Sequence, residues 1–224
     1  MNPSELKKKT LIWTVVSFLM MGLLLFLPAG TVFYWQAWVY MAILFVPMLF
    51  AIGYLLKYDP VLLERRLRLK EKLVLQDRLI KWAYLIFGLF LVIPGLDQRY
   101  HWSKVAPAVV VPAEILVLAG YILCLWVFKE NPYASRIVEV MPEQKVVTTG
   151  LYALVRHPMY LGALVMYVFT PLALGSYWAL LLIPFLTIFL VLRILDEEKL
   201  LLRQLRGYWE YTQKTRYRLI PGIW

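Results

Sequence analysis

The chain has 224 residues, and 62% of them are hydrophobic, which exceeds the roughly 45–50% typical of soluble domains and indicates a membrane protein. It contains one cysteine, Cys124, so an intramolecular disulfide is excluded and a cysteine-based metal site is not supported. The net charge of +10 would suit nucleic acid, but the basic residues flank apolar runs, a pattern typical of proteins at a membrane surface. We therefore expect membrane lipids as partners, with no nucleic acid and no metal.

Six apolar runs predict transmembrane helices, each of which needs around 20 residues and no fewer than about 17. In chain order they are residues 11–27, 33–56, 79–96, 105–128, 158–174 and 177–192. The last run is slightly short, so it would need little tilt or additional flanking residues. Only Gly175 and Ser176 separate the last two runs, which predicts a tight helical hairpin. The first run follows three lysines, as in a signal peptide, but we interpret it as a retained span because the rest of the chain is equally apolar.

The distribution of Lys and Arg predicts the orientation. With a cytoplasmic N-terminus, every Lys and Arg except Arg99 and Lys104 lies at or near the cytoplasmic face. Such an excess is what the positive-inside rule requires, so both termini are expected in the cytoplasm.

The predicted fold class is therefore all-α: a polytopic membrane bundle of about six helices that ends in a tight hairpin and a cytoplasmic C-terminal helix. Residues 1–128 would form the N-terminal membrane helices, and residues 129–224 a loop, the hairpin and the last helix. Residues 58–78 alternate leucine with charge, which fits either a helix in the headgroup plane or a solvated connecting helix.

Residues 150–162 join a polar segment to a new apolar run. Pro158 suits the first position of a helix, because it lacks the N–H that would be unpaired there. Arg156 and His157 would then lie at the positive end of that helix, where an anion is favoured. The alternative is that Arg156 only anchors the span at the interface and His157 only precedes the helix.

A second charged cluster lies at the inner end of the sixth run. Arg193 and Glu197 are four residues apart and would share a helix face, with Glu198 beside them. A charge deep in a span costs on the order of 2.5–3.5 kcal/mol, so such charges tend to be paired or functional. Ordinary interfacial charges remain the alternative. The preceding loop carries β-branched residues that would line a pocket: Ile137, Val138, Val140, Val146 and Val147.

Several motifs occur in order through this half of the chain. They are Gly150-Leu151-Tyr152, Arg156-His157-Pro158-Met159-Tyr160-Leu161-Gly162, Arg193 with Glu197-Glu198, Gly207-Tyr208 with Tyr211, and Arg218-Leu219-Ile220-Pro221. Together they resemble the isoprenylcysteine carboxyl methyltransferase family, which in this half is similar to integral-membrane phospholipid methyltransferases. The resemblance covers roughly residues 131–224, and the first four spans resemble the family only in hydrophobicity. It implies S-adenosylmethionine (SAM) bound near the cytoplasmic face and a lipophilic or prenylated acceptor that enters from the bilayer.

The resemblance also implies site residues. Arg156 and His157 would meet the SAM carboxylate, and Glu197 or Glu198 its ammonium group. The full set of candidate cofactor-binding residues is Gln144, Val147, Gly150, Leu151, Tyr152, Arg156, His157, Tyr160, Gly162 and Glu198. The candidate catalytic residues are Arg193, which would hold an acceptor carboxylate with its forked guanidinium, and Glu197, which would deprotonate an amine acceptor.

Other functions stay open at this stage. The acceptor is either the carboxyl of an isoprenylcysteine-like molecule or the amino headgroup of a phospholipid. A haem-binding or sensory membrane protein, with His157 as an axial ligand, is the alternative from another class. A soluble dinucleotide-type SAM domain is not supported, because the chain has no Gly-x-Gly-x-x-Gly motif.

Overall fold

The computed structural model describes residues 2–67, 74–134, 140–141 and 143–224, and for residues 74–83 it describes the backbone alone. Within these residues the chain is helical and no strand occurs. The helices are α1 (Pro3–Ala29), α2 (Trp35–Tyr58), α3 (Pro60–Arg66), α4 (Val74–Tyr100), α5 (Pro107–Glu130), α6 (Leu151–Leu154), α7 (Pro158–Ala173), the 3₁₀ helix η1 (Trp178–Leu182), α8 (Ile183–Gln204) and α9 (Tyr208–Lys214).

Local sequence explains where several helices begin and end. At α1, Asn2 and Glu5 form a reciprocal capping box, and the helix ends at Gly30 in the left-handed conformation. Pro107 and Pro158 occupy the first turns of α5 and α7, where a missing N–H costs nothing. The prediction that a helix begins at Pro158 is therefore confirmed.

The polytopic helical bundle is also confirmed. Four helical segments are long and apolar enough to cross a membrane, namely Pro3–Ala29, Trp35–Tyr58, Pro107–Glu130 and Trp178–Gln204, and α7 is a shorter apolar helix. The third predicted run, 79–96, lies within α4 and partly outside the described side chains. The total of six spans therefore stays a prediction.

Two helices extend beyond the predicted apolar runs. α4 continues past residue 96 to Tyr100. α8 continues past residue 192 through the charged cluster to Gln204. A helix satisfies its own backbone hydrogen bonds, so it can leave the apolar layer without ending there. The hydropathy of the sequence detects only the apolar part of such a helix.

The hairpin between α7 and α8 is as tight as predicted. Gly175 adopts a left-handed conformation with φ of 70°, and its N–H donates to the carbonyl of Leu172. The N–H of Ser176 donates to the carbonyl of Pro171. These bonds reverse the chain directly after α7.

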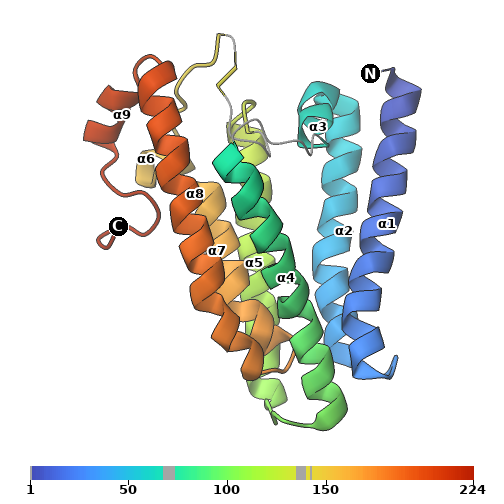
Figure 1. The fold of residues 1–224 in the computed structure, drawn as a ribbon. Coiled ribbons are helices and arrows are strands. Elements are labelled where there is room, and N and C mark those ends of the chain that lie inside the picture. The colour runs from blue at the N-terminus through green and yellow to red at the C-terminus, as the bar shows by residue number, and fades with distance from the viewer. Residues whose placement is uncertain (1, 68–73, 135–139, 142) are drawn as a thin grey trace.

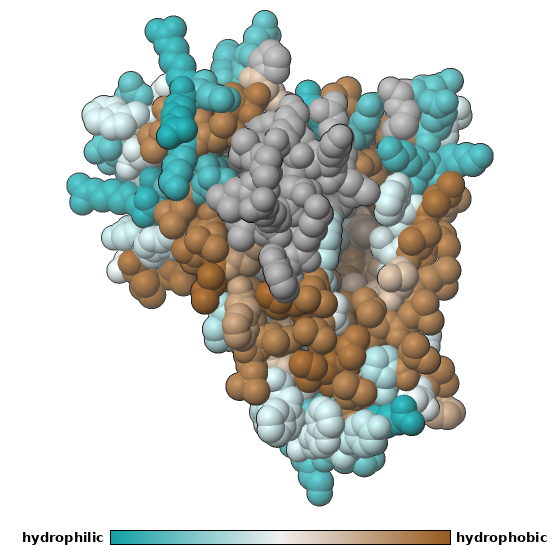
Figure 2. All heavy atoms as spheres, viewed as in Figure 1, coloured by the Kyte–Doolittle hydropathy of each residue, from teal (hydrophilic) through white to brown (hydrophobic). Residues whose placement is uncertain are grey.

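The helices lie side by side, with α1 and α2 at one edge, α7 and α8 at the other, and the N-terminus, α3 and α9 at one end (Figure 1). Apolar side chains cover the middle of the visible face and hydrophilic ones gather at its ends (Figure 2). The largest buried cluster, which includes Leu25, Tyr34, Tyr40 and Leu174, lies toward the opposite end from α9. The bundle is therefore held together most firmly at the end away from α3 and α9.

The segment at residues 58–78 divides in two. Asp59 caps α3 by accepting a hydrogen bond of 2.9 Å from the N–H of Leu62. Leu62 and Leu63 are buried against Leu6 and Leu55, so α3 packs on the bundle through its leucines. Residues 68–73 lie outside the described residues.

Two glycines let α5 and α7 cross closely. A Cβ atom on Gly162 would lie 2.6 Å from the carbonyl oxygen of Gly120, and one on Gly120 would lie 2.8 Å from that of Gly162. Small residues commonly allow this approach between membrane helices.

We therefore expect Gly162→Ala to destabilise the protein by about 1–3 kcal/mol, because the added methyl group forces the two helices apart. Thermal unfolding in detergent would measure the loss. Gly53→Ala is the matched control, since its added Cβ would meet nothing within 4 Å. Equal melting temperatures for the two variants would contradict the close crossing.

Candidate functional site

A pocket lies where the end of α5 and the start of α7 meet α8 and α9. It is open to the outside, and the space within it and its mouth amounts to about 880 Å³. Its walls come from residues 131–134 and 144–147, from α6, from the first turn of α7, from the charged part of α8 and from α9.

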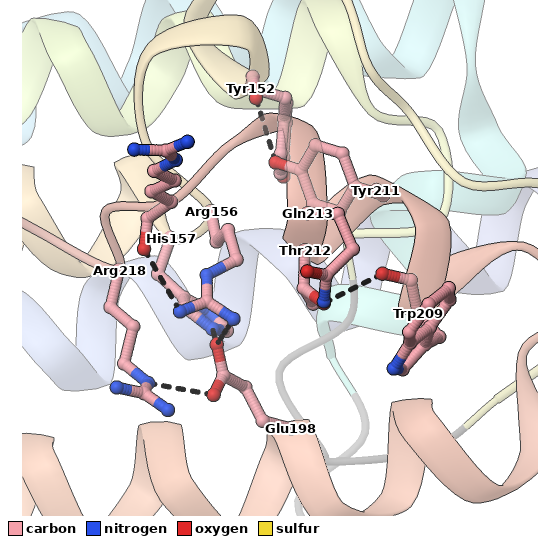
Figure 3. Close-up of polar contacts among 10 residues, drawn as sticks. Tyr152, Arg156, His157, Glu198, Trp209, Tyr211, Thr212, Gln213 and Arg218 are labelled. Carbon is pink, nitrogen blue, oxygen red and sulfur yellow. Dashed lines mark hydrogen bonds and ion pairs between the residues drawn. The ribbon is translucent and has the colours of Figure 1, made fainter.

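A buried carboxylate, Glu198, pairs with the part of the pocket wall that Arg156 and His157 form. Arg156 Nη1 lies 3.0 Å and His157 Nε2 3.3 Å from Glu198 Oε1, and Arg218 Nε donates to Glu198 Oε2 at 2.7 Å (Figure 3). Only 4% of Glu198 is exposed. Two guanidinium groups share this one carboxylate, so the cluster carries a net positive charge.

The C-terminal strap, residues 215–224, fixes the same wall through its backbone. The N–H groups of Arg156 and His157 donate to the carbonyls of Tyr217 and Arg218, both at 2.9 Å. Beside them, Tyr211 of α9 donates its hydroxyl to the carbonyl of Tyr152 at 2.7 Å (Figure 3). The two residues that precede α7 are thus held by the strap and by α8 together.

A tyrosine joins α7 to the charged turn of α8. The hydroxyl of Tyr160 donates to Glu197 Oε2 at 2.6 Å and accepts from Arg193 Nε at 3.0 Å. All three side chains line the pocket. Arg193 and Glu197 share a helix face as predicted, and Tyr160 bridges them across the helix pair.

Two buried polar atoms of the pocket residues have no hydrogen-bond partner within the described part of the chain: Arg156 Nε and the hydroxyl of Tyr208. A buried polar group without a partner is costly. Burial raises the pKa of Tyr208 well above its usual value, and nearby Glu198 adds to the effect. The pocket therefore offers one cationic donor and one neutral hydroxyl.

The part of the pocket wall next to the end of α5 is polar. Asn131 Nδ2 donates to the hydroxyl of Tyr152 at 2.7 Å. Burial raises the pKa of Tyr152 to about 12 although the bond to Asn131 works against it, so this hydroxyl is protonated at neutral pH. Gln144 also lines this wall, and its Oε1 accepts from the N–H of Met141 at 2.9 Å.

The structure brings most of the predicted site residues to one pocket. The lining includes Gln144, Val147, Tyr152, Arg156, His157, Tyr160, Arg193 and Glu197. Val146 also lines it, as expected for an apolar loop, whereas Ile137 and Val138 lie outside the described residues.

Four predicted residues lie outside the lining. Gly150 adopts a φ of 58° and packs on the Glu130 carboxylate, which accepts from the N–H of Leu151 at 2.9 Å. Gly162 faces the backbone of α5, and Glu198 is engaged by Arg156, His157 and Arg218. Of the four, Glu198 contacts residues that do line the pocket, namely Arg156 and His157.

Sequence reasoning missed several lining residues, among them Asn131, Tyr133, Leu201, Tyr208 and Tyr211. The spacing of the last two was an available signal, because residues three apart on a helix face the same way. Asn131 and Leu201 gave no such signal, since an amide after a span and a leucine on a helix are common in any fold. Among the described residues no group of three His, Cys, Asp or Glu side chains is placed to hold a metal.

Comparison with known proteins supports the resemblance noted in the sequence. Residues 112–203 match the family model described as the isoprenylcysteine carboxyl methyltransferase (ICMT) family. No curated protein and no solved structure matches the chain. The matched range contains α7 and nearly all of α8 and ends before α9 and the strap, so the resemblance is confirmed over that range and supports a membrane methyltransferase.

Replacing Glu198 by Gln should destabilise the protein by about 3–5 kcal/mol, because removing one partner leaves buried cations uncompensated. We also expect faster tryptic cleavage after Arg216 and Arg218 as the strap loosens. Thermal unfolding and mass spectrometry of the digest would measure both effects. Glu210→Gln, at an exposed position on α9, is the control; a melting temperature and digest equal to those of this control would show that Glu198 does not hold the strap.

Proposed function

We propose that this chain is an integral-membrane methyltransferase that uses SAM and methylates a lipophilic acceptor, with the carboxylate of an isoprenylcysteine-like molecule as the preferred acceptor. The observation that carries the proposal is a pocket lined by Arg156, Arg193 and Glu197, all of which lie in the family-matched range. We place this pocket at the cytoplasmic face, following the distribution of Lys and Arg.

The pocket offers partners for the carboxylate, the ammonium group and the adenine of SAM. The net positive cluster of Arg156, Arg218 and Glu198 suits its carboxylate, and Arg156 is the member of that cluster that lines the pocket. Glu197 is the pocket carboxylate for its ammonium group. Glu198 is a weaker candidate for that role because it is buried between two guanidinium groups and the His157 imidazole. The adenine would lie against Val147 and neighbouring apolar residues.

When bound, SAM would supply a methyl group activated by its sulfonium, and the acceptor oxygen would form a bond to the methyl carbon as the S–CH₃ electron pair returns to sulfur. The protein would align the acceptor oxygen with the methyl carbon and exclude water from the site. Arg193 would hold the acceptor carboxylate with its guanidinium. Tyr160, fixed between Arg193 and Glu197, would keep that guanidinium oriented. A carboxylate is already ionised at neutral pH, so no general base is required.

A phospholipid amino headgroup remains the second candidate, because Glu197 lies in the pocket and would accept the amine proton. The guanidinium of Arg193 in the same pocket favours an anionic acceptor instead. Axial ligation of haem is disfavoured by geometry, since His157 Nε2 faces Glu198 at 3.3 Å and the ring is buried.

Replacing Arg156 by Gln should weaken binding of S-adenosylhomocysteine by about 10- to 100-fold, since a hydrogen bond to a charged group contributes about 1.5–3 kcal/mol. Isothermal titration calorimetry in detergent would measure the affinity. Arg216→Gln removes the same charge from an exposed side chain of the strap and should leave the affinity unchanged. Undiminished affinity in the Arg156 variant would refute the proposed carboxylate site.

Replacing Arg193 by Ala should leave binding of S-adenosylhomocysteine nearly unchanged and lower kcat/KM for the acceptor by about 100-fold, the scale of losing an ionic hydrogen-bonded pair. The assay is methyl transfer from labelled SAM to N-acetyl-S-farnesylcysteine, with phosphatidylethanolamine vesicles as the competing acceptor. Arg203→Ala, at an exposed position of α8, is the control. If cofactor affinity and turnover fell together, Arg193 would belong to the cofactor site; preferential labelling of phosphatidylethanolamine would favour the amino-headgroup reaction.

A further inference from the structure

The C-terminal strap turns back from α9 and packs along α7 and α8. Leu219 is buried in one cluster with Leu190 and Ile194 of α8, and Trp224 packs against this cluster. Leu190 lies inside Trp178–Gln204, one of the segments apolar enough to cross a membrane. In Figure 1 the C-terminus accordingly lies nearer the middle of the bundle than α9 does. The strap therefore lies against a membrane-spanning helix.

The strap ends in a tight turn that its own backbone closes. The N–H groups of Leu219 and Ile220 donate to the main-chain oxygen of Trp224 at 2.9 and 3.1 Å. Gly222 has a left-handed φ of 82°, which a glycine adopts without strain. The turn leaves the side chain of Ile223 at its tip 77% exposed. A large apolar side chain presented beside a membrane-spanning helix is placed to contact lipid.

Exposed aromatic and cationic side chains accompany this tip. Trp209 on α9 is 62% exposed, and Tyr217 on the strap is 40% exposed. The exposed charged side chains of residues 205–224 are three cations and one carboxylate: Arg206, Lys214, Arg216 and Glu210. Aromatic rings together with cations are typical of segments at the level of the lipid head groups, where the rings lie at the boundary and the cations meet phosphates. The excess of positive charge favours anionic head groups over neutral ones.

The strap residues with exposed side chains also hold the pocket wall through their backbone. Arg156 Nη2 donates to the carbonyl of Arg216 at 3.2 Å. The N–H groups of Arg156 and His157 donate to the carbonyls of Tyr217 and Arg218, both at 2.9 Å. Arg156 and His157 line the pocket, whereas the side chains of Arg216 and Tyr217 are exposed. A contact that holds these two exposed side chains in place would therefore also hold the pocket wall.

We propose that α9 and the strap bind anionic phospholipids of the adjoining leaflet, with Lys214 and Arg216 on the phosphates and Ile223 in the apolar layer, and that this contact tightens cofactor binding. The lipid contact stabilises the docked strap because a displaced strap would lose it, and only a difference of this kind can shift the equilibrium. The effect on the cofactor rests on the proposed function. The binding of the strap to lipid does not, so the two are tested separately.

The charge of the leaflet tests the effect on the cofactor. In nanodiscs, we expect the wild type to bind S-adenosylhomocysteine about fivefold more tightly when phosphatidylglycerol is added to phosphatidylcholine, the scale of one cation at an anionic surface. A double variant, Lys214→Gln with Arg216→Gln, should lose this gain and keep the wild-type affinity in phosphatidylcholine alone. The matched control is Lys7→Gln with Lys8→Gln, which removes the same charge from exposed positions of α1 at the same end of the bundle and should keep the gain (Figure 1).

Proteolysis tests the binding of the strap to lipid without any cofactor. Tryptic cleavage after Arg218 should slow about fivefold when phosphatidylglycerol is added to the wild type, and should not slow in the double variant. Ile223→Asp should speed this cleavage in both kinds of nanodisc, because it places a charge in the apolar layer. Since Ile223 is 77% exposed, the change would report lipid contact and not packing. Gln213→Asp, which adds the same charge at an exposed position of α9, is the control and should leave the rate unchanged.

The outcomes separate this inference from the proposed function. Cofactor affinity and cleavage rates that are the same in the two kinds of nanodisc would overturn the inference and leave the function standing. A gain that persists in the double variant, or that disappears equally in the α1 control, would show that the strap is not the lipid-binding surface.

Two further results are decisive. Protection of the strap by an acidic peptide, with none from phosphatidylglycerol, would assign the surface to a protein partner and overturn the lipid proposal. Slower cleavage with phosphatidylglycerol in a protein that binds no S-adenosylhomocysteine in either nanodisc would overturn the proposed function and the effect on the cofactor, while supporting the binding of the strap to lipid.

Discussion

The burial of one carboxylate, Glu198, among Arg156, His157 and Arg218 is the interaction on which the site depends. A buried charge is tolerated only when it is paired and hydrogen-bonded, so the two guanidinium groups and the imidazole must converge on it. Their convergence brings together α8, the residues before α7 and the C-terminal strap, which are far apart in the sequence. This pairing therefore links three segments beside the pocket.

The sequence predicted the features that depend on local chemistry. Pro158 begins α7, Gly175 reverses the hairpin, and Arg193 shares a face with Glu197, because proline, glycine and helical spacing each act over a few residues. The sequence could not distinguish Glu197 from Glu198. Adjacent residues on a helix face different neighbours, and only the packing of α7 and the strap determines which of them lines the pocket.

Features that arise from packing between distant helices gave no signal in the sequence. Gly162 was assigned to the cofactor, yet its missing side chain accommodates the backbone of Gly120. An apolar cavity between α1, α2, α3, α5 and α7 was not foreseen either, because its lining residues look like ordinary span residues until the helices are placed around them. Arg66 lies among several charges of a basic segment, and its position beside Phe128 and Met159 depends on how α3 packs.

The two ends of the bundle serve different purposes. At the end that contains Tyr34 and Leu174, buried side chains fill the space between the helices, so few positions remain for a ligand. At the other end the pocket beside α8 and α9 and the apolar cavity between α1, α2, α3, α5 and α7 both adjoin the first turn of α7. Met159, directly after the helix-initiating Pro158, lines both of them. The local rule that begins α7 at Pro158 therefore also fixes where these two spaces adjoin.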